Sequence, residues 1–152
     1  CPSQQAMIEA TNRLAAQCDV FLPGLSEGQL FSGRQAPRDI ADYYLDMGIG
    51  KVIVKLGDTG SVAFGRNADG GRTEVVVPSF VVDVVDTVGA GDGFASGVIT
   101  GLLEDLDDDA LLERANAVGA IQVTSVSDSE GLPTVEELRK FIAFTPRKEV
   151  EL

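Results

Sequence analysis

Apolar residues recur at helical spacing in the first part of the chain. In the stretch 4–17, Met7, Ala10 and Leu14 follow one another at intervals of three and four, and Cys18 continues the series. This spacing is typical of an amphipathic helix. We therefore expect a helix here, with its apolar face packed against a neighbouring element.

A short strand and two further helices are expected next. The apolar run "DVFLPG" predicts a strand that ends at Pro23 and Gly24, and "SEGQLFSG" predicts a short helix capped by Ser26. The stretch "APRDIADYYLDMGIG" predicts another helix, because Pro37 is tolerated near a helix start and Gly48 is favoured at a helix end.

The middle of the chain is rich in β-branched residues. "KVIVKLG" is typical of a strand covered on both faces, and "GSVAFG" follows the "GDTG" turn as its hairpin partner. "RTEVVVPSF" and "VVDVVD" are two further predicted strands. Helices are predicted over 92–104, 108 to about 126, and 135–144, the last with a capping box from Thr134 to Glu137. This order predicts an α/β fold with a parallel or mixed sheet between helices.

Composition and charge narrow the classes of function. The 152 residues suffice for one domain with its own core. A net charge of −12 disfavours nucleic acid and anionic membranes as partners, because binding to them depends on Lys and Arg. The absence of histidine excludes Ser-His-Asp and Cys-His catalysis within these residues. Two cysteines and no long apolar run lead us to expect a cytoplasmic protein.

The stretch "DTVGAGDGFASG", residues 86–97, places four glycines beside Asp92 where a helix is expected to begin. Unpaired N–H groups converge at a helix start, its dipole favours an anion, and small residues let that anion approach. The N–H groups of Gly89, Ala90 and Gly91 could then hold a phosphoryl group while Asp92 takes a proton from the attacking hydroxyl. A plain helix cap at Asp92 is the alternative.

The same stretch matches no general nucleotide-binding pattern. Phe94 stands where the third glycine of G-x-G-x-x-G would be, and no P-loop pattern occurs. Instead, "DTVGAGDGFASGVI" resembles the second signature of the ribokinase-like (phosphofructokinase-B type) carbohydrate kinases. The similarity extends from "CDVFLPGLSEG" and "VIVKLGDTG" to "RANAVGAIQV" and "GLPTVEEL". Within the family, the chain is most similar to 2-keto-3-deoxygluconate kinases.

The resemblance implies which fold the chain has and which part of the kinase domain it represents. It implies a three-layer ribokinase-like fold, with a mostly parallel sheet flanked by helices and an antiparallel edge. Residues 1–152 would be the C-terminal part of the kinase domain, without the N-terminal half that carries the sugar-binding segments and the lid.

The resemblance also implies roles around the glycine-rich stretch. Asp92 would activate the sugar hydroxyl, and the amides of Gly89, Ala90 and Gly91 would form the anion hole. Asp86 would shape the turn, in a region where relatives hold a monovalent cation.

Other positions match the nucleotide-binding parts of the family. Lys55, Gly57 and Gly60 match the loop that lies along the nucleotide phosphates, and Asn116 matches a helix residue near the adenine. A plain hairpin turn and a helix-surface asparagine are the respective alternatives.

Metal and sugar contacts are implied at two acidic residues. Glu27 matches the glutamate that organises the magnesium water shell, although Gly24 stands where asparagine is usual. Asp128 matches an acidic residue that holds sugar hydroxyls. A solvated surface position is the alternative for both carboxylates.

The implied function is the transfer of the γ-phosphoryl group from ATP, with Mg²⁺, to a sugar hydroxyl. The expected acceptor is 2-keto-3-deoxygluconate. A kinase of the same family for fructose, ribose or a nucleoside is one alternative, and an inactive nucleotide-binding fragment is another. The expected partners are ATP, the sugar or sugar acid and the missing N-terminal half; a monovalent cation and a homo-oligomer are left open.

Overall fold

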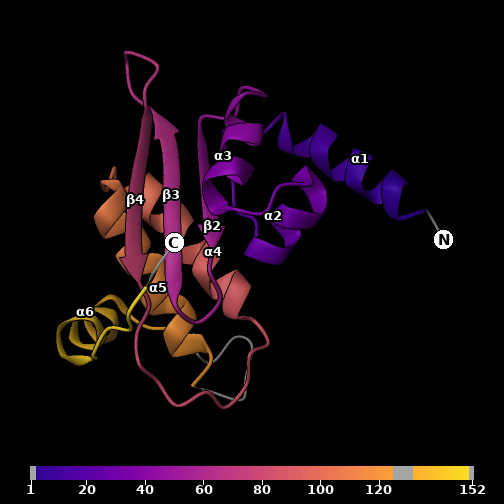
Figure 1. Ribbon diagram of the computed structural model, residues 1–152. Helices are drawn as coiled ribbons and strands as arrows, with labels where there is room; N and C mark the ends of the chain where they lie inside the picture. The colour runs from indigo at the N-terminus through magenta and orange to yellow at the C-terminus, as the bar shows by residue number, and fades with distance from the viewer. Residues whose placement is uncertain (1–2, 125–131, 151–152) are drawn as a thin grey trace. The chain divides into compact units, whose positions relative to one another are not determined.

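The computed structural model describes residues 3–124 and 132–150. Within these ranges the chain forms six α-helices and four β-strands (Figure 1). None of these helices combines the length and the apolar character that crossing a bilayer requires. In chain order the elements are α1 (Gln4–Ala15), β1 (Val20–Phe21), α2 (Leu25–Ser32), α3 (Pro37–Leu45), β2 (Lys51–Lys55), β3 (Gly60–Arg66), β4 (Arg72–Pro78), α4 (Ala90–Leu103), α5 (Asp108–Gln122) and α6 (Val135–Phe144).

The strands form one mixed sheet in the order β1-β2-β3-β4. β1 and β2 are parallel, with Val20 opposite Lys51 and Phe21 opposite Val52. β3 and β4 run in opposite directions on either side of a turn at 67–71 (Figure 1). The predicted α/β class is therefore confirmed, but over the described residues the sheet is mixed rather than mostly parallel.

The chain packs as two compact units. Unit 1 comprises the chain up to Gly57 together with Val62–Val75, and unit 2 comprises Asp58–Ser61 together with most of the chain from Val76 onwards. Unit 1 thus holds α1 to α3, β1 and β2, and unit 2 holds α4 to α6. Strands β3 and β4 each pass from one unit into the other.

The core of unit 1 forms around β2, whose central residues Val52, Ile53 and Val54 are fully buried. This confirms that the continuous apolar run is a strand covered on both faces. Tyr44 of α3 is also fully buried, with its ring centroid 4.5 Å from that of Phe21.

The expected packing of the apolar face of α1 is wrong for the described residues. Met7 is 43% exposed and Leu14 is 67% exposed, whereas Ala15 is buried. The inward contact is polar: the Asn12 amide donates to the Phe31 carbonyl oxygen at 2.9 Å and its Oδ1 accepts from the Tyr44 hydroxyl at 2.9 Å. These hydrogen bonds orient α1 with its apolar stripe outward.

Unit 2 is built on a close pairing of α4 and α5. A Cβ atom added at Gly97 would lie 2.6 Å from the Ala115 Cα, so only glycine allows the two backbones to approach this closely. A second cluster joins Phe80 to α5 and α6, with the Phe80 ring centroid 4.9 Å from that of Phe141.

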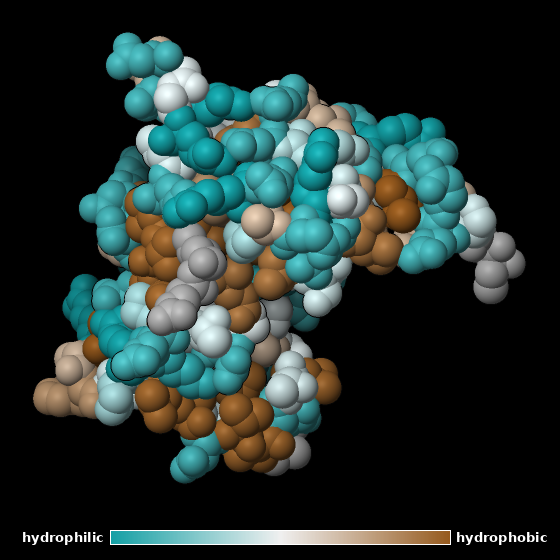
Figure 2. Space-filling view, viewed as in Figure 1, coloured by the Kyte–Doolittle hydropathy of each residue, from teal (hydrophilic) through white to brown (hydrophobic). Residues whose placement is uncertain are grey.

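The predicted strand "VVDVVD" at 81–86 is wrong. Its N–H groups bond to carbonyl groups outside any strand: Val81 donates to the Pro146 carbonyl, and Val85 and Asp86 donate to the carbonyl of Val123 at the end of α5. Apolar side chains are consequently exposed along this segment (Figure 2), including Val84 at 55% and Val85 at 58%.

Helix starts agree with the sequence only in part. The capping box of α6 is confirmed, because the Thr134 hydroxyl accepts from the Glu137 N–H and the Glu137 carboxylate accepts from the Thr134 N–H. Ser26 was expected to cap α2, but the cap is Gly24, so Ser26 lies inside the helix. Helix α4 begins at Ala90, two residues before the expected start.

Candidate functional site

The glycine-rich turn leads directly into α4, as the sequence predicts. Gly89 is the N-cap and has a φ of +79°, a left-handed conformation that side chains disfavour. The Gly93 N–H donates to the Gly89 carbonyl at 2.8 Å and closes the first helical turn. Ala90 and Gly91 are thus the first two helical residues, and Asp92 is the third.

Within the part of the chain that the structure describes, several backbone N–H groups of this turn have no acceptor. The Ala90 N–H donates to the Thr87 carbonyl at 3.3 Å, a long hydrogen bond. Across residues 3–124 and 132–150, no acceptor bonds to the N–H groups of Gly89, Gly91 or Asp92. Unpaired N–H groups at a helix start attract anions, and the helix dipole adds to this attraction.

The carboxylate of Asp92 lies on the outside of the first turn of α4. Asp92 and Gly91 are both exposed, while the next two residues, Gly93 and Phe94, are buried against the rest of unit 2. The burial of Phe94 fixes the helix, and the exposed carboxylate stays accessible to a ligand. An accessible carboxylate beside open amide donors is the geometry that proton abstraction next to a phosphoryl group requires.

The side chain of Asp86 stabilises the turn by a local hydrogen bond. Its Oδ1 accepts the Val88 N–H at 3.0 Å, which is a local side-chain turn. No group of three acidic or cysteine side chains within the described ranges is arranged as a metal site. A metal role for Asp86 therefore stays a prediction.

Glu27 also makes a local structural contact. Its Oε2 accepts the Gly24 N–H at 2.7 Å, which is one half of a capping box at the start of α2. The residue is exposed. The contribution of Glu27 to a magnesium shell stays a prediction.

The residues expected to follow the nucleotide phosphates lie at the end of β2, in the loop after it and at the start of β3. The Lys55 N–H donates to the Pro23 carbonyl at 2.9 Å, which extends the parallel pairing of β1 and β2. Gly57 has a φ of +69° with open space around it. At Gly60, with a φ of +154°, an added Cβ would lie 2.3 Å from the Val77 carbonyl oxygen, so the fold itself requires glycine there.

Asn116 is neither a surface residue nor open to a ligand. It is 4% exposed, its Oδ1 accepts from the Ser61 hydroxyl at 3.0 Å, and its amide nitrogen donates to the Val77 carbonyl at 3.0 Å. The alternative of a helix-surface asparagine is therefore wrong. The side chain joins α5 to β3 and β4, so any role at a nucleotide would act through the position of these strands.

The small residues beside Asn116 do not leave an open slot. Ala117 and Ala120 are buried in the Phe80 cluster, and a Cβ at Gly119 would lie 3.3 Å from the Ala90 carbonyl oxygen. Their small size permits close packing inside unit 2. These residues therefore form part of the packed interior of unit 2 rather than a ligand pocket beside Asn116.

One expected site residue cannot be placed. Asp128 lies outside the described residues. Sequence reasoning in turn missed Ser61, which is fully buried and bonds to Asn116. A lone serine in the apolar run "GSVAFG" was the available signal, because a buried hydroxyl needs a polar partner.

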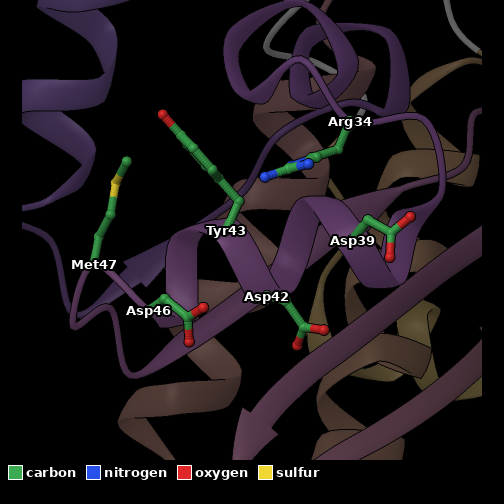
Figure 3. Close-up of a pocket in the computed structure, with 6 residues that line it drawn as sticks. All are labelled: Arg34, Asp39, Asp42, Tyr43, Asp46 and Met47. Atoms are coloured by element: carbon green, nitrogen blue, oxygen red, sulfur yellow. The ribbon is translucent and has the colours of Figure 1, made fainter.

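The cavity in Figure 3 belongs to unit 1 and contains none of the expected site residues. It has a volume of about 390 Å³, and Asp39 and Asp42 of α3 lie along it together with Asp46, the residue that caps the end of α3 (Figure 3). Two of these carboxylates are already paired with arginines of the β3–β4 hairpin, Asp42 with Arg72 and Asp46 with Arg66. The cavity is therefore a surface depression in which two of the carboxylates already have arginine partners.

A model of the pfkB family of carbohydrate kinases matches residues 1–135. The chain belongs to this family. The match covers the glycine-rich turn and Asp92 together with the Lys55–Gly60 region and Asn116. The sequence resemblance is thereby confirmed at the level of the family.

Individual pfkB relatives are similar over most of this chain. A 2-dehydro-3-deoxygluconokinase of Bacillus subtilis is 46% identical over 143 residues, which is 93% of this chain and 43% of that protein. The E. coli protein assigned as a ribokinase II, in complex with ATP and Mg²⁺, has a TM-score of 0.81 at 31% identity and covers 90% of this chain and 43% of its own.

A third relative is a Vibrio cholerae fructokinase double mutant bound to fructose, ADP and potassium ion. It has a TM-score of 0.78 at 25% identity, over 91% of this chain and 45% of that chain. The present chain thus spans less than half the length of these three proteins. The ribokinase-like fold is shared with them.

Proposed function

We propose that this chain is the C-terminal part of an ATP-dependent sugar kinase that phosphorylates 2-keto-3-deoxygluconate. The observation that carries the proposal is the glycine turn at the start of α4, where open backbone N–H groups lie beside the exposed carboxylate of Asp92. Membership of the pfkB family and the 46% identity to a 2-dehydro-3-deoxygluconokinase support the reaction and the acceptor.

Asp92 acts as the general base in this proposal. Its carboxylate accepts the proton of the acceptor hydroxyl while the hydroxyl oxygen attacks the γ-phosphorus of ATP. The bond from the γ-phosphorus to the bridging oxygen breaks, and ADP leaves with that oxygen. The N–H groups of Gly89 and Gly91 donate to the phosphoryl oxygens during the transfer, and the helix dipole favours their negative charge.

Glu27 and Asp86 fit a magnesium ion that binds together with the nucleotide. Mg²⁺ is usually held by substrate phosphates and one or two carboxylates rather than by a protein cage. Glu27 and Asp86 are the carboxylates we propose for outer contacts. When bound, the ion supplies charge neutralisation on the phosphates.

Lys55, Gly57 and Gly60 are proposed to border the nucleotide phosphates. Gly57 fits a close approach to a ligand, because the space around it is open. Gly60 and Asn116 fit an indirect role, since both hold β3 against β4. Asp128 is proposed to hold acceptor hydroxyls, and a monovalent cation near the glycine turn stays a proposal supported by the potassium-bound fructokinase relative.

The base assignment is tested with Asp92→Asn in the natural full-length protein that carries this chain. Asparagine keeps the shape but cannot take up the proton, so we expect kcat to fall by about 10²-fold or more with little change in unfolding temperature. Asp83→Asn is the matched control, because it removes the same charge from an exposed position outside the turn. Near-normal turnover by Asp92→Asn would refute the assignment.

A panel of acceptors distinguishes the substrate from its alternatives. We expect phosphorylation of 2-keto-3-deoxygluconate and little activity on fructose, ribose or nucleosides. A preference for a neutral sugar would replace the proposed acceptor and leave the kinase assignment in place. The non-catalytic alternative concerns residues 1–152 alone, which we expect to bind ATP weakly without phosphorylating sugar; robust turnover by this segment would contradict that expectation.

A further inference from the structure

The segment Pro146–Lys148 lies against the stretch that follows β4. The Val81 N–H donates to the Pro146 carbonyl at 2.9 Å, and the Lys148 N–H donates to the Ser79 carbonyl at 2.8 Å. Between them, Phe80 and Arg147 form an antiparallel bridge. The backbone of this segment is therefore fixed inside unit 2 by paired hydrogen bonds.

The side chain of Arg147 anchors the same segment. Its guanidinium lies 4.1 Å from the centroid of the Phe80 ring, and one nitrogen lies 2.6 Å from Oε1 of Glu113 on α5. A cation over an aromatic ring and an ion pair both resist displacement. Lys148 thus extends from a backbone whose position is set by its neighbours.

Lys148 reaches the loop before β3. Its Nζ lies 2.7 Å from Oδ2 of Asp58. The side chain of Lys148 is 25% exposed and that of Asp58 is 79% exposed. The lysine is therefore mostly covered by protein, and the carboxylate lies on its solvent side. The hydrogen bond from Lys148 lowers the pKa of the Asp58 carboxyl below its usual value, and the lysine charge acts in the same direction.

A second bond ties the same loop to the same place. The Ser79 N–H donates to the Thr59 carbonyl at 2.8 Å, and Ser79 also accepts the bond from Lys148. Thr59 is thus bound by Ser79, and Asp58 is bound by Lys148, which itself bonds to Ser79. An ordinary exposed ion pair lacks such support and contributes little.

Asp58 raises an electrostatic problem in a phosphate-binding loop. Its position lies between Gly57 and Gly60, which border the nucleotide phosphates in the proposed function. A carboxylate close to a triphosphate repels it, and in a chain with 24 acidic and 12 basic residues there is little positive charge to offset that repulsion. A cation fixed beside Asp58 removes the difficulty.

We propose that Lys148 is a positioning residue for nucleotide binding: from the C-terminal segment it neutralises Asp58, so that this carboxylate does not repel the nucleotide phosphates. This inference rests on the proposed function. It adds that the C-terminal segment takes part in nucleotide binding, and it explains how the loop can contain a carboxylate close to the phosphates.

The test measures ATP binding and turnover by the natural full-length protein. The variants are Lys148→Met, Asp58→Asn and their combination. Binding of a non-hydrolysable ATP analogue with Mg²⁺ is followed by calorimetry, and turnover gives kcat and KM for ATP. Lys140→Met is the matched control, since Lys140 pairs with Glu136 at 2.8 Å on α6 and its loss changes the net charge equally.

We expect Lys148→Met to weaken ATP binding and to raise KM for ATP about three- to tenfold, with kcat within about twofold of the wild type. The double variant should return close to wild-type affinity, because it no longer contains the unpaired carboxylate. The effect should shrink at about 1 M salt, where charges are screened over about 3 Å. Asp58→Asn alone should bind ATP as well as the wild type or better.

Three results would overturn the inference: Lys148→Met binding like Lys140→Met, a double variant as weak as Lys148→Met, or weaker ATP binding by Asp58→Asn. The Asp58→Asn arm keeps the test decisive if Lys148→Met fails to fold. Failure of the proposed function looks different, because the wild-type protein would then neither bind the analogue nor phosphorylate a sugar.

Discussion

Replacing Gly97 by alanine tests whether the α4–α5 contact sets the position of α4, the helix that carries Asp92. Gly97 lies five residues after Asp92 on α4. An added Cβ would meet the Ala115 Cα at 2.6 Å, the Ala115 nitrogen at 3.1 Å and the Arg114 carbonyl oxygen at 3.2 Å. All three are backbone atoms of α5, so relief requires the helices to separate.

Two opposing effects decide the size of the change. Alanine is favoured over glycine inside a helix by about 1 kcal/mol, which would stabilise the variant. Forcing a methyl group into a packed contact costs about 1–3 kcal/mol, and contacts to backbone fall at the upper end because no side chain can turn away. We therefore expect Gly97→Ala to lower the free energy of unfolding by about 1–2 kcal/mol.

The assay is urea unfolding of the natural full-length protein, combined with kcat for phosphoryl transfer. Gly101→Ala is the control, because its nearest neighbour is Cγ of the Leu111 side chain at 3.1 Å, and the backbone is no closer than 3.5 Å. Gly101→Ala should stay within about 1 kcal/mol of the wild type. A shift of α4 by about 1 Å can lower kcat up to about 10²-fold in Gly97→Ala.

The reasoning fails if Gly97→Ala is as stable as Gly101→Ala, or more stable than the wild type. Helix propensity would then outweigh the contact, and the two helices would have room to separate at little cost. Loss of stability with unchanged kcat would separate the two claims, since it would support the contact but not its influence on Asp92.

Two further outcomes follow from buried polar groups. Asn116→Ala leaves the Ser61 hydroxyl and a strand carbonyl without their partner, so we expect a loss of about 2–4 kcal/mol in urea unfolding, more than for Ser61→Ala; equal losses would contradict this account. Burial raises the pKa of Tyr44 to about 12 from 10.0, so its stabilising effect is fully present below pH 10 and is lost as the pH rises towards 12. Tyr44→Phe should therefore lack much of the alkaline fall in stability that the wild type and Tyr43→Phe show in denaturation at a series of pH values.

Sequence patterns predicted most elements because local rules govern them. The apolar run at 52–54 was predicted as a covered strand, and Thr134 with Glu137 determines the start of α6 by two hydrogen bonds. The glycine turn was predictable for the same reason, since a left-handed cap at Gly89 needs a residue without a side chain. The position of Asp92 within the first turn of α4 follows from it.

The errors arose where a partner elsewhere in the chain decides the outcome. Residues 81–86 have the composition of a strand, but a strand needs a neighbour, and here their N–H groups bond to the carbonyls of Val123 and Pro146. Met7 and Leu14 have helical spacing, but Asn12 donates a hydrogen bond to the Phe31 carbonyl and accepts one from the Tyr44 hydroxyl, so α1 turns the other way. No periodicity in the sequence records such long-range bonds.

The cap of α4 has a consequence for how the helix is completed. Helices α1, α5 and α6 each supply a side-chain oxygen to their own first turn, from Ser3, Asp107 and Thr134. Helix α4 starts from a bare glycine, which stabilises a helix start less than such an oxygen by only about a few tenths of a kcal/mol. In the proposed function, an incoming phosphoryl group would give the first N–H groups of α4 the acceptor that these three helices take from their own side chains, so ligand binding would stabilise the start of the helix.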